Sequence, residues 1–381
     1  MHRKILMQPL LCKKKYMKKT FLAALIVLAF GCKKTVTEIV QVPIKHSWLY
    51  DSSLFSYNKI ITSSVQINDS TLACFNKQIM TFINPSQLNG STNGAILGTT
   101  YGDLIPISLS PKIGIYPTDI NTLRVFSASN PNWNYGGFLF KPTYSNSNTS
   151  IKGFPLANSG AGYPIINDKY VLAPCEIDYT NQVTKCNLIR IDTTVGIPNS
   201  IQLGTSKDIF LTPAPSTTGF SSGNYYSFGF FNKFFLTIAN QFYRIDTLGN
   251  VKAFGYGPLP IPNCRVSQMF TIGNYLFAIT FSDILISNDF GETWSVFAST
   301  PGFIYLVLTY QSIGNELYAF YNSQLWRVAN TGSTLKYTEL DNDGLATSQI
   351  TGLQKVGKFA FISTLSGLYY RDTATLNTPK K

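Results

Sequence analysis

Few side chains in this sequence have both the type and the spacing that catalysis requires. Histidine, the most frequent general base in enzymes, occurs only at His2 and His46. The sequence patterns HExxH and the P-loop do not occur. An acidic string at residues 341–344 resembles a calcium-binding loop, but Ile350 stands where such a loop needs a bidentate glutamate. The sequence therefore favours a non-catalytic function, and we expect no catalytic residue, no metal and no cofactor.

The cysteines give no metal site either. Four of the six remain once Cys12 and Cys32 are set aside, and none of them belongs to a CxxC pair or a Cys/His cluster of the kind that binds zinc. Cys175 and Cys186 flank a segment that is typical of a hairpin, with its turn at residues 180–181. Such a hairpin would place the two thiols opposite each other. We expect either a disulfide between them or two buried free thiols.

The N-terminus has the features of an export signal. A pair of lysines at residues 18–19 precedes an apolar run at residues 21–30, which is too short to span a bilayer, and Gly31-Cys32 follows. This ending resembles the lipobox of bacterial lipoproteins, which implies cleavage before Cys32 and lipid on its sulfur. Residues 1–31 are then a signal peptide, for which Met17 is an alternative start. Several acyl chains hold a protein to a membrane almost irreversibly.

The charge argues against a nucleic-acid partner. Seven of the 31 basic residues and none of the 19 acidic residues precede Cys32, so the remaining chain has a net charge of +5. No run of five basic residues occurs, whereas phosphate binding needs clustered lysine and arginine. Acidic residues directly after Cys32 are absent too. In similar lipoproteins such residues often mark retention or surface export. We therefore expect an anchor in the outer membrane that faces the periplasm, with exposure at the cell surface as the alternative.

A repeat fills the C-terminal half of the chain. Polar turns followed by apolar strands recur about every 42 residues, near residues 231–236, 272–278, 313–319 and 356–361. In each unit a short turn leads to a second strand, and less regular copies precede these four. Strand, turn and strand at a period near 40 predict the four-stranded blades of a β-propeller. Counting second strands gives seven blades, while six or eight also fit. We expect the N-terminal strand to close the ring by pairing with the last blade.

One motif makes the resemblance more specific. Residues 287–294 match the pattern SxDxGxTW without a gap through five positions: Ser287, Asp289, Gly291, Thr293 and Trp294. Here the chain resembles the BNR or Asp-box β-propellers, which include sialidases, sortilin-type receptors and photosystem assembly factors. The resemblance implies a structural role for the box, on a hairpin away from the ligand face. Locally, we expect the Ser287 and Asp289 side chains to bind backbone N–H groups and the Trp294 ring to be buried.

The sialidase branch of this resemblance fits the sequence poorly. Its signature near the first arginine is F/Y-R-I-P, and the nearest string here, residues 243–246, lacks the proline and looks like one of the repeat strands. Glutamate occurs only five times, in no recognisable pair. A divergent glycan-active hydrolase remains only an alternative.

The sequence thus predicts an all-β lipoprotein. Its parts are a signal peptide (1–31), a lipid-anchored tether (32–50), a propeller (51–375) and a tail (376–381). Residues 127–163 form an insertion rich in aromatic side chains, and insertions in repeat arrays often lie on the binding face. We expect Trp133, Tyr135 and Tyr163 there to contact a protein or glycan ligand. Assembly of a membrane protein complex is the other function considered.

Overall fold

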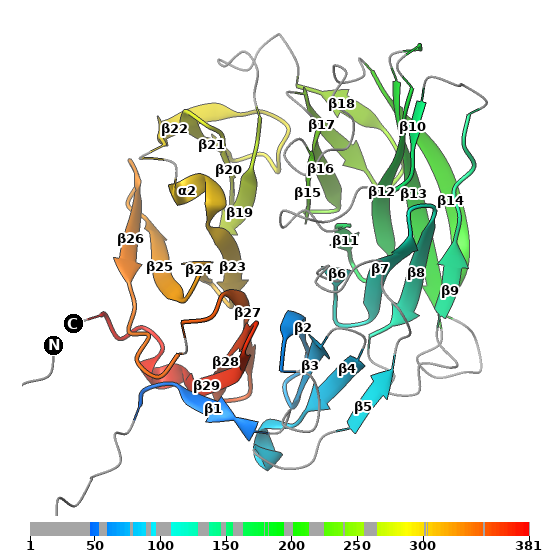
Figure 1. Cartoon of the computed structure of the whole chain (residues 1–381). Coiled ribbons are helices and arrows are strands. Elements are labelled where there is room, and N and C mark those ends of the chain that lie inside the picture. The colour runs from blue at the N-terminus through cyan, green and yellow to red at the C-terminus, as the bar shows by residue number, and fades with distance from the viewer. Residues whose placement is uncertain are drawn as a thin grey trace, which may run out of the picture. The chain divides into compact units, whose positions relative to one another are not determined.

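The structure, a computed structural model, describes residues 46–380 except 53–58, 77–78, 89–92, 97–107, 129–136, 146–149, 155–162, 179, 182, 194–200, 213–224, 239–240, 255–264, 301, 303 and 346. Its strands form seven antiparallel sheets that surround a common centre like blades (Figure 1). The predicted seven-bladed β-propeller is confirmed. Among the described residues the one α-helix is α2 (Ile304–Val307), and none of the helices there is long and apolar enough to cross a bilayer.

Each blade takes its strands in chain order from the centre outward, and we number the blades from the N-terminus. Blade 1 contains β2 (Ile61–Asn68), β3 (Thr71–Asn76), β4 (Ile79–Ile83) and β5 (Asn93–Ile96). Blade 2 contains β6 (Ser108–Leu109), β7 (Ile113–Asp119), β8 (Thr122–Ser127) and β9 (Gly137–Phe140). Blade 3 contains β10 (Ser150–Lys152), β11 (Ile165–Ile166), β12 (Tyr170–Asp178), β13 (Val183–Thr193) and β14 (Ile201–Leu211). In blade 3, β10 and β11 pair with opposite ends of β12 and together replace a single inner strand.

The C-terminal blades are the most regular. Blade 4 contains β15 (Tyr225–Phe230), β16 (Lys233–Ile238), β17 (Gln241–Asp246) and β18 (Val251–Ala253). Blade 5 contains β19 (Gln268–Ile272), β20 (Tyr275–Ile279), β21 (Asp283–Ser287) and β22 (Ser295–Ser299). Blade 6 contains β23 (Thr309–Ile313), β24 (Glu316–Tyr321), β25 (Gln324–Asn330) and β26 (Leu335–Glu339). Blade 7 contains β27 (Ile350–Val356), β28 (Phe359–Thr364) and β29 (Gly367–Asp372).

The N-terminal strand completes the last blade. Strand β1 (Leu49–Asp51) pairs antiparallel with β29, with Tyr50 opposite Tyr369. The sheet order is therefore β1-β29-β28-β27, and the two ends of the described chain close the ring. The predicted closure is confirmed. Residues 46–50, which the sequence assigned to the tether, and residues 376–380, assigned to the tail, contact this closure.

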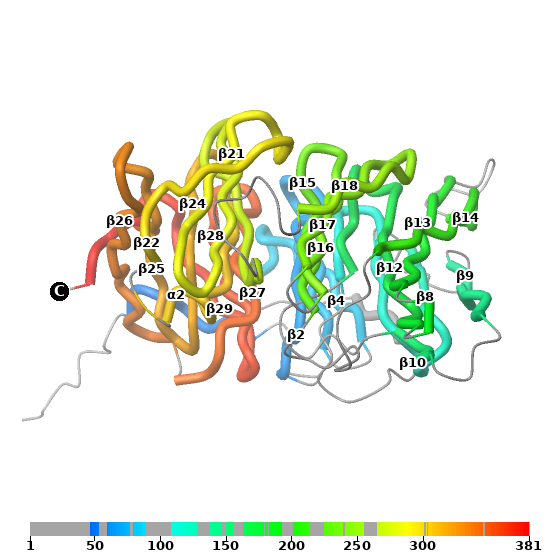
Figure 2. The backbone as a smooth tube through the Cα atoms, turned by 90° about the horizontal axis from the view of Figure 1, so that it is seen from above, coloured from blue at the N-terminus to red at the C-terminus, as the bar shows by residue number. Residues whose placement is uncertain are grey.

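Because every sheet is antiparallel, the connections fall on two faces of the ring. We call face A the side where the first strand of a blade turns into the second and the third turns into the outermost. We call face B the side that carries the turn from second to third strand and the links between blades. Figure 2, a view turned by 90°, shows the connections above and below the sheets.

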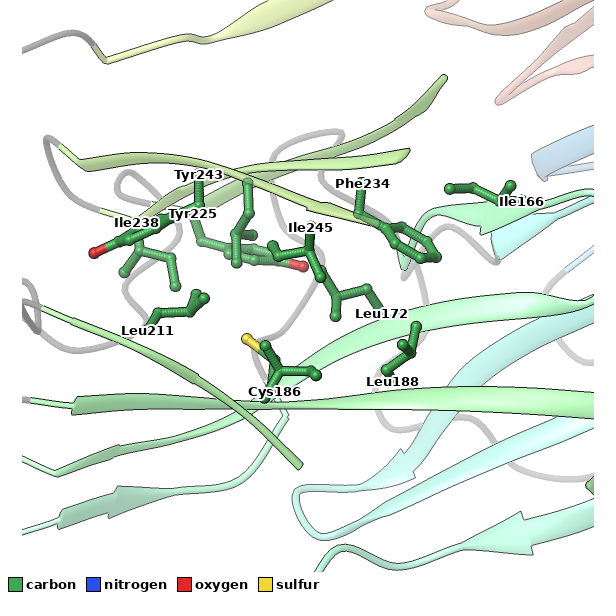
Figure 3. Packing of buried hydrophobic residues seen from close by; sticks show 12 residues of the cluster. Ile166, Leu172, Cys186, Leu188, Leu211, Tyr225, Phe234, Ile238, Tyr243 and Ile245 are labelled. Carbon is green, nitrogen blue, oxygen red and sulfur yellow. The ribbon is translucent and has the colours of Figure 1, made fainter. Parts of the chain in front are cut away.

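The core lies between neighbouring blades rather than inside any one of them. Strands such as β16, with burial on both faces, carry apolar side chains at consecutive positions because a blade is covered on both sides. Between blades 3 and 4, Leu172 and Leu188 from one sheet meet Phe234 and Ile245 from the other (Figure 3). No blade could bury these surfaces alone, which is why the repeats must stack.

Cys175 and Cys186 form no disulfide, and both thiols are free and buried. A β-bulge interrupts the pairing of β12 with β13, so that Pro174 lies opposite Cys186. Cys175 consequently packs toward blade 2 and Cys186 toward blade 4, on opposite faces of one sheet. Of the two arrangements that the sequence left open, a disulfide or two buried free thiols, the structure has the free thiols. The hairpin itself does form.

Candidate interaction surface on face A

The 287–294 loop joins β21 to β22 on face A, and two side chains organise it. The Ser287 hydroxyl accepts from the Gly291 N–H at 2.8 Å and donates to Asp289 at 2.7 Å. The Asp289 carboxylate accepts from the N–H groups of Glu292 and Thr293 and from the Thr293 hydroxyl, at 3.1, 2.9 and 2.5 Å. Slight burial raises the pKa of Asp289, but these hydrogen bonds outweigh it and lower the pKa to about 2. The loop is therefore tied to an ionised carboxylate.

Two further residues fix the loop against blade 4. Gly291 has a φ of +81°, and a Cβ there would lie 2.4 Å from the ring of Phe235. The Trp294 ring, 7% exposed, meets the rings of Phe235 and Phe242 at centroid distances of 6.2 and 5.9 Å. The Phe235 ring can lie this close to the loop because residue 291 has no side chain. The loop of blade 5 is thus packed onto its neighbour.

Glu292, at the end of the same loop, links the two blades electrostatically. Its carboxylate accepts from Lys233 at 2.7 Å and forms ion pairs with Arg244 and, at 3.7 Å, with Lys252, all three from blade 4. Hydrogen bonds from Lys233 and Arg244 lower the pKa of Glu292 to about 2. The same lysines also donate to backbone carbonyls of the loop, Lys233 to Phe290 at 3.1 Å and Lys252 to Glu292 at 2.6 Å. We call these four side chains the Glu292 clamp.

The clamp holds two phenylalanines side by side at the surface. Phe231 lies in the turn between β15 and β16, and Phe290 lies in the 287–294 loop. Their rings meet edge to face with centroids 5.0 Å apart and planes 67° apart, and the residues are 38% and 50% exposed. Tyr275, the first residue of β20 and 44% exposed, lies on the same face of blade 5.

Both phenylalanines have a left-handed backbone, with φ of +51° at Phe231 and +59° at Phe290. This conformation costs an L-residue with a bulky side chain about 1 kcal/mol or more. The equivalent turns of blades 5, 6 and 7 have glycine at the left-handed position, namely Gly273, Gly314 and Gly357. Blade 4 alone of these four places a large apolar side chain where glycine is easiest to accommodate.

The sequence aligned this turn one residue out of register. The repeat ranges given above begin at Phe231 and at Ile272, the last residue of an inner strand, and so align these two residues. The pairing of Phe230 with Lys233 and of Ile272 with Tyr275 shows that Phe231 corresponds to Gly273. A phenylalanine at a turn position was the one signal for this surface, and the misplaced register hid it.

Of the three aromatic residues expected to contact a ligand, Tyr163 is the one that the structure describes. Trp133 and Tyr135 lie outside the residues that the structure describes. Tyr163 is 3% exposed, and its ring packs edge to face on Phe154, 6.1 Å away, in the core between blades 2 and 3. Tyr163 therefore packs within the fold and offers almost no contact surface.

The residues weighed for catalysis are also separated. Arg244, of the sialidase-like string, belongs to β17 and is used in the Glu292 clamp. His46 lies at the entry of the chain, where its Nδ1 is 3.1 Å from Asp343, and both side chains are about half exposed. The residues that the structure describes contain no group of three or more histidine, cysteine, aspartate or glutamate side chains able to hold a metal ion.

Solved structures of other proteins resemble this chain in fold. No family model and no curated protein matches the chain. A catalytically inactive virginiamycin B lyase from Staphylococcus aureus aligns with 86% of this chain and 98% of its own length, at 13% identity and a TM-score of 0.50. The extracellular domain of a putative one-component system from B. thetaiotaomicron aligns at 11% identity and a TM-score of 0.48. PorZ, a surface component of the type-IX secretion system of Porphyromonas gingivalis, aligns at 9% identity and a TM-score of 0.45.

The chain spans 40% and 38% of the chains of the last two proteins. At such identities a likeness carries over the architecture and no activity. The likeness to the lyase agrees with the seven sheets and the ring closure described above. The chain is a seven-bladed β-propeller.

Proposed function

We propose that this protein is a lipid-anchored, non-catalytic propeller of the bacterial cell envelope that binds a protein partner through Phe231 and Phe290 on face A. The observation that carries the proposal is that both residues combine a left-handed backbone with an exposed apolar ring. Each feature alone is unfavourable for an isolated molecule, and glycine or asparagine would avoid both. Strain of this kind clusters at functional sites.

The geometry favours a protein over a glycan. The planes of the two rings are 67° apart, so the rings form an angled surface and not the flat one on which a sugar ring could stack. Lys233 and Arg244, which hold the loop that carries Phe290, are paired with Glu292, so they are poorly placed to bind sugar hydroxyls. An aromatic pair surrounded by polar groups is typical of protein hot spots.

The envelope location rests on the sequence. Residues 18–32 supply the basic segment, the apolar run and the cysteine of a lipoprotein signal, and residues 287–294 resemble an Asp-box. Lipid on Cys32 would hold the propeller at the membrane surface. The contacts of the 287–294 loop agree with the structural role that the resemblance implies for the Asp-box.

Site-specific photo-crosslinking in living cells tests the proposal. The photoreactive residue p-benzoylphenylalanine replaces Tyr275, which is exposed on face A of blade 5, in the full chain. We expect a discrete adduct with a protein, and we expect the substitutions Phe231→Asn and Phe290→Asn together to remove it. The same probe at Phe210, an exposed residue on the outer strand of blade 3, serves as the control. An adduct that survives the double substitution, or one digested by glycosidases, would refute protein binding by the pair.

A further inference from the structure

The described chain enters the propeller beside a turn on face B. His46 and Ser47 bind Asp343: the His46 Nδ1 lies 3.1 Å from one carboxylate oxygen, and the Ser47 hydroxyl donates to the Asp343 carbonyl at 2.9 Å. The Trp48 N–H donates to the same carbonyl at 3.0 Å, and its indole N–H donates to the Asp341 carbonyl at 3.0 Å. Trp48 is 1% exposed. The start of the fold is therefore fixed to residues 341–343.

Residues 340–342, in turn, are fixed to face B of blade 6. The Leu340 N–H donates to the Leu325 carbonyl at 2.8 Å, and the Asn342 side chain donates to the Ser323 carbonyl at 3.1 Å. Ser323 belongs to the turn from β24 to β25, which lies on face B. The tether that precedes His46 consequently joins the ring next to that turn.

Three exposed apolar side chains lie on the same face of blades 5 and 6. Phe281 is 78% exposed in the turn between β20 and β21, Tyr321 is 38% exposed at the end of β24, and Ile304 is 41% exposed in α2. Helix α2 lies in the link between the two blades, and the Thr300 N–H ties the start of this link to the Ser282 carbonyl at 2.8 Å. We call Phe281, Ile304 and Tyr321 the face B apolar surface. Residues 279–283, 304–308 and 321–323 contain no lysine or arginine.

The sequence limits how far this surface can be from the anchor. Thirteen residues separate Cys32 from His46, and an extended chain of that length spans at most about 45 Å. The entry of the fold, next to face B, therefore lies within about 45 Å of the anchored residue. Aromatic and aliphatic side chains on turn tips, without basic neighbours, suit the apolar boundary of the headgroup region rather than an anionic partner.

We propose that face B of blades 5 and 6 rests on the membrane that holds Cys32, with Phe281 at the level of the lipid headgroups. The inference rests on the lipid anchoring in the proposed function and adds an orientation to it. Face A, with Phe231 and Phe290, then points away from the bilayer toward soluble domains of a partner. The lipid and the apolar surface together make two membrane contacts, on one side of the ring.

Depth-dependent fluorescence quenching tests the orientation. The lipidated full chain is reconstituted into phosphatidylcholine vesicles with and without lipids brominated near the headgroup. The variants Phe281→Trp, on face B, and Tyr275→Trp, on face A, are compared with the parent, which supplies the background emission. We expect brominated lipids to quench at least half of the emission that Phe281→Trp adds and less than a tenth of that added by Tyr275→Trp. Equal quenching of the two would overturn the orientation.

A second measurement separates this inference from the proposal on which it rests. If the parent does not float with vesicles, lipid anchoring has failed and the orientation fails with it. If it floats but bromine leaves the emission added by Phe281→Trp unchanged, only the orientation is wrong, and crosslinking from face A is unaffected. If the orientation is right, a water-soluble quencher should also act about twofold more strongly on the emission that Ile304→Trp adds when Phe281→Ser is present in the same chain.

Discussion

Glu292 of blade 5 accepts a hydrogen bond from Lys233 of blade 4 at 2.7 Å, across the boundary between two repeats. Arg244 and Lys252 of the same blade share this carboxylate. A propeller blade is usually joined to its neighbour by apolar packing, and here a charged contact is added on face A. The contact holds the 287–294 loop, and hence Phe290, in place next to Phe231.

Replacing Glu292 with glutamine should destabilise the fold by about 1 kcal/mol. Three cations lose their counter-charge, and the side chains of two of them, Lys233 and Arg244, are largely buried. The loss is limited because Glu292 is partly exposed and solvent screens its ion pairs. Chemical denaturation of the wild type and variant measures the difference. Glu339→Gln is the control, because Glu339 pairs with Lys380 at the surface and its loss should cost less than about 0.5 kcal/mol. Equal effects of the two substitutions would argue against the clamp.

The contribution of the two loop carboxylates should disappear in acid. The folded pKa values of Asp289 and Glu292 are both about 2, below the ordinary values of 3.8 and 4.5. Lowered folded pKa values mean that the stabilisation is complete above the unfolded pKa values and is lost as the pH falls through the folded ones. The stability gap between the wild type and the Asp289→Asn/Glu292→Gln variant should therefore be constant above about pH 5 and close between pH 4.5 and 2. Denaturation at a series of pH values shows whether it does.

Gly291→Ala should cost about 2–3 kcal/mol. The residue has φ of +81°, and the new Cβ would overlap the ring of Phe235 at 2.4 Å. Gly273→Ala is the matched control, because Gly273 has φ of +60° and nothing within 4 Å of the new Cβ, so that only backbone strain of about 1 kcal/mol remains. Thermal unfolding of both variants separates steric overlap from strain. A smaller loss at Gly291 than at Gly273 would mean that Phe235 moves without cost.

Phe231→Asn should leave the protein as stable as the wild type or stabilise it by up to about 1 kcal/mol. Asparagine tolerates the left-handed conformation, while the ring contact that is lost lies at the surface. The same variant should weaken the crosslink from residue 275. This combination of kept stability and lost binding is the mark of a residue retained for function. A loss of more than about 1 kcal/mol would show instead that Phe231 serves the fold.

The buried thiols should be inert until the protein unfolds. Burial raises the pKa of Cys175 to about 12 and raises the pKa of Cys186 well above its ordinary value, so thiolate is scarce at neutral pH. A maleimide reagent should label neither cysteine in the folded protein and both in denaturant, with peptide mass spectrometry to locate the label. A reductant should leave the unfolding temperature unchanged. A mass lower by two hydrogens on the peptides that contain Cys175 and Cys186 would contradict this result.

The sequence by itself determined the architecture of this protein. The apolar strands recur with a period near 42 residues and are separated by polar turns. Sheets of that length bury their apolar side chains only when each sheet packs against its neighbours. The pattern favoured seven blades, with six or eight as alternatives, and closure by an N-terminal strand. The seven sheets and the pairing of β1 with β29 confirm both expectations. The local contacts of Ser287 and Asp289 were also readable, because each lies within four residues of its partners.

Only the tertiary structure decided what lies at the surface and which residues share a side. Phe231 and Phe290 are 59 residues apart, and only the stacking of blades 4 and 5 brings their rings together. One bulged residue in β12 turned Cys175 away from Cys186, and a register shift of one residue hid the turn position of Phe231. In a strand, a change of one residue moves a side chain to the opposite face, so periodicity alone fixes the blades but not the sites between them.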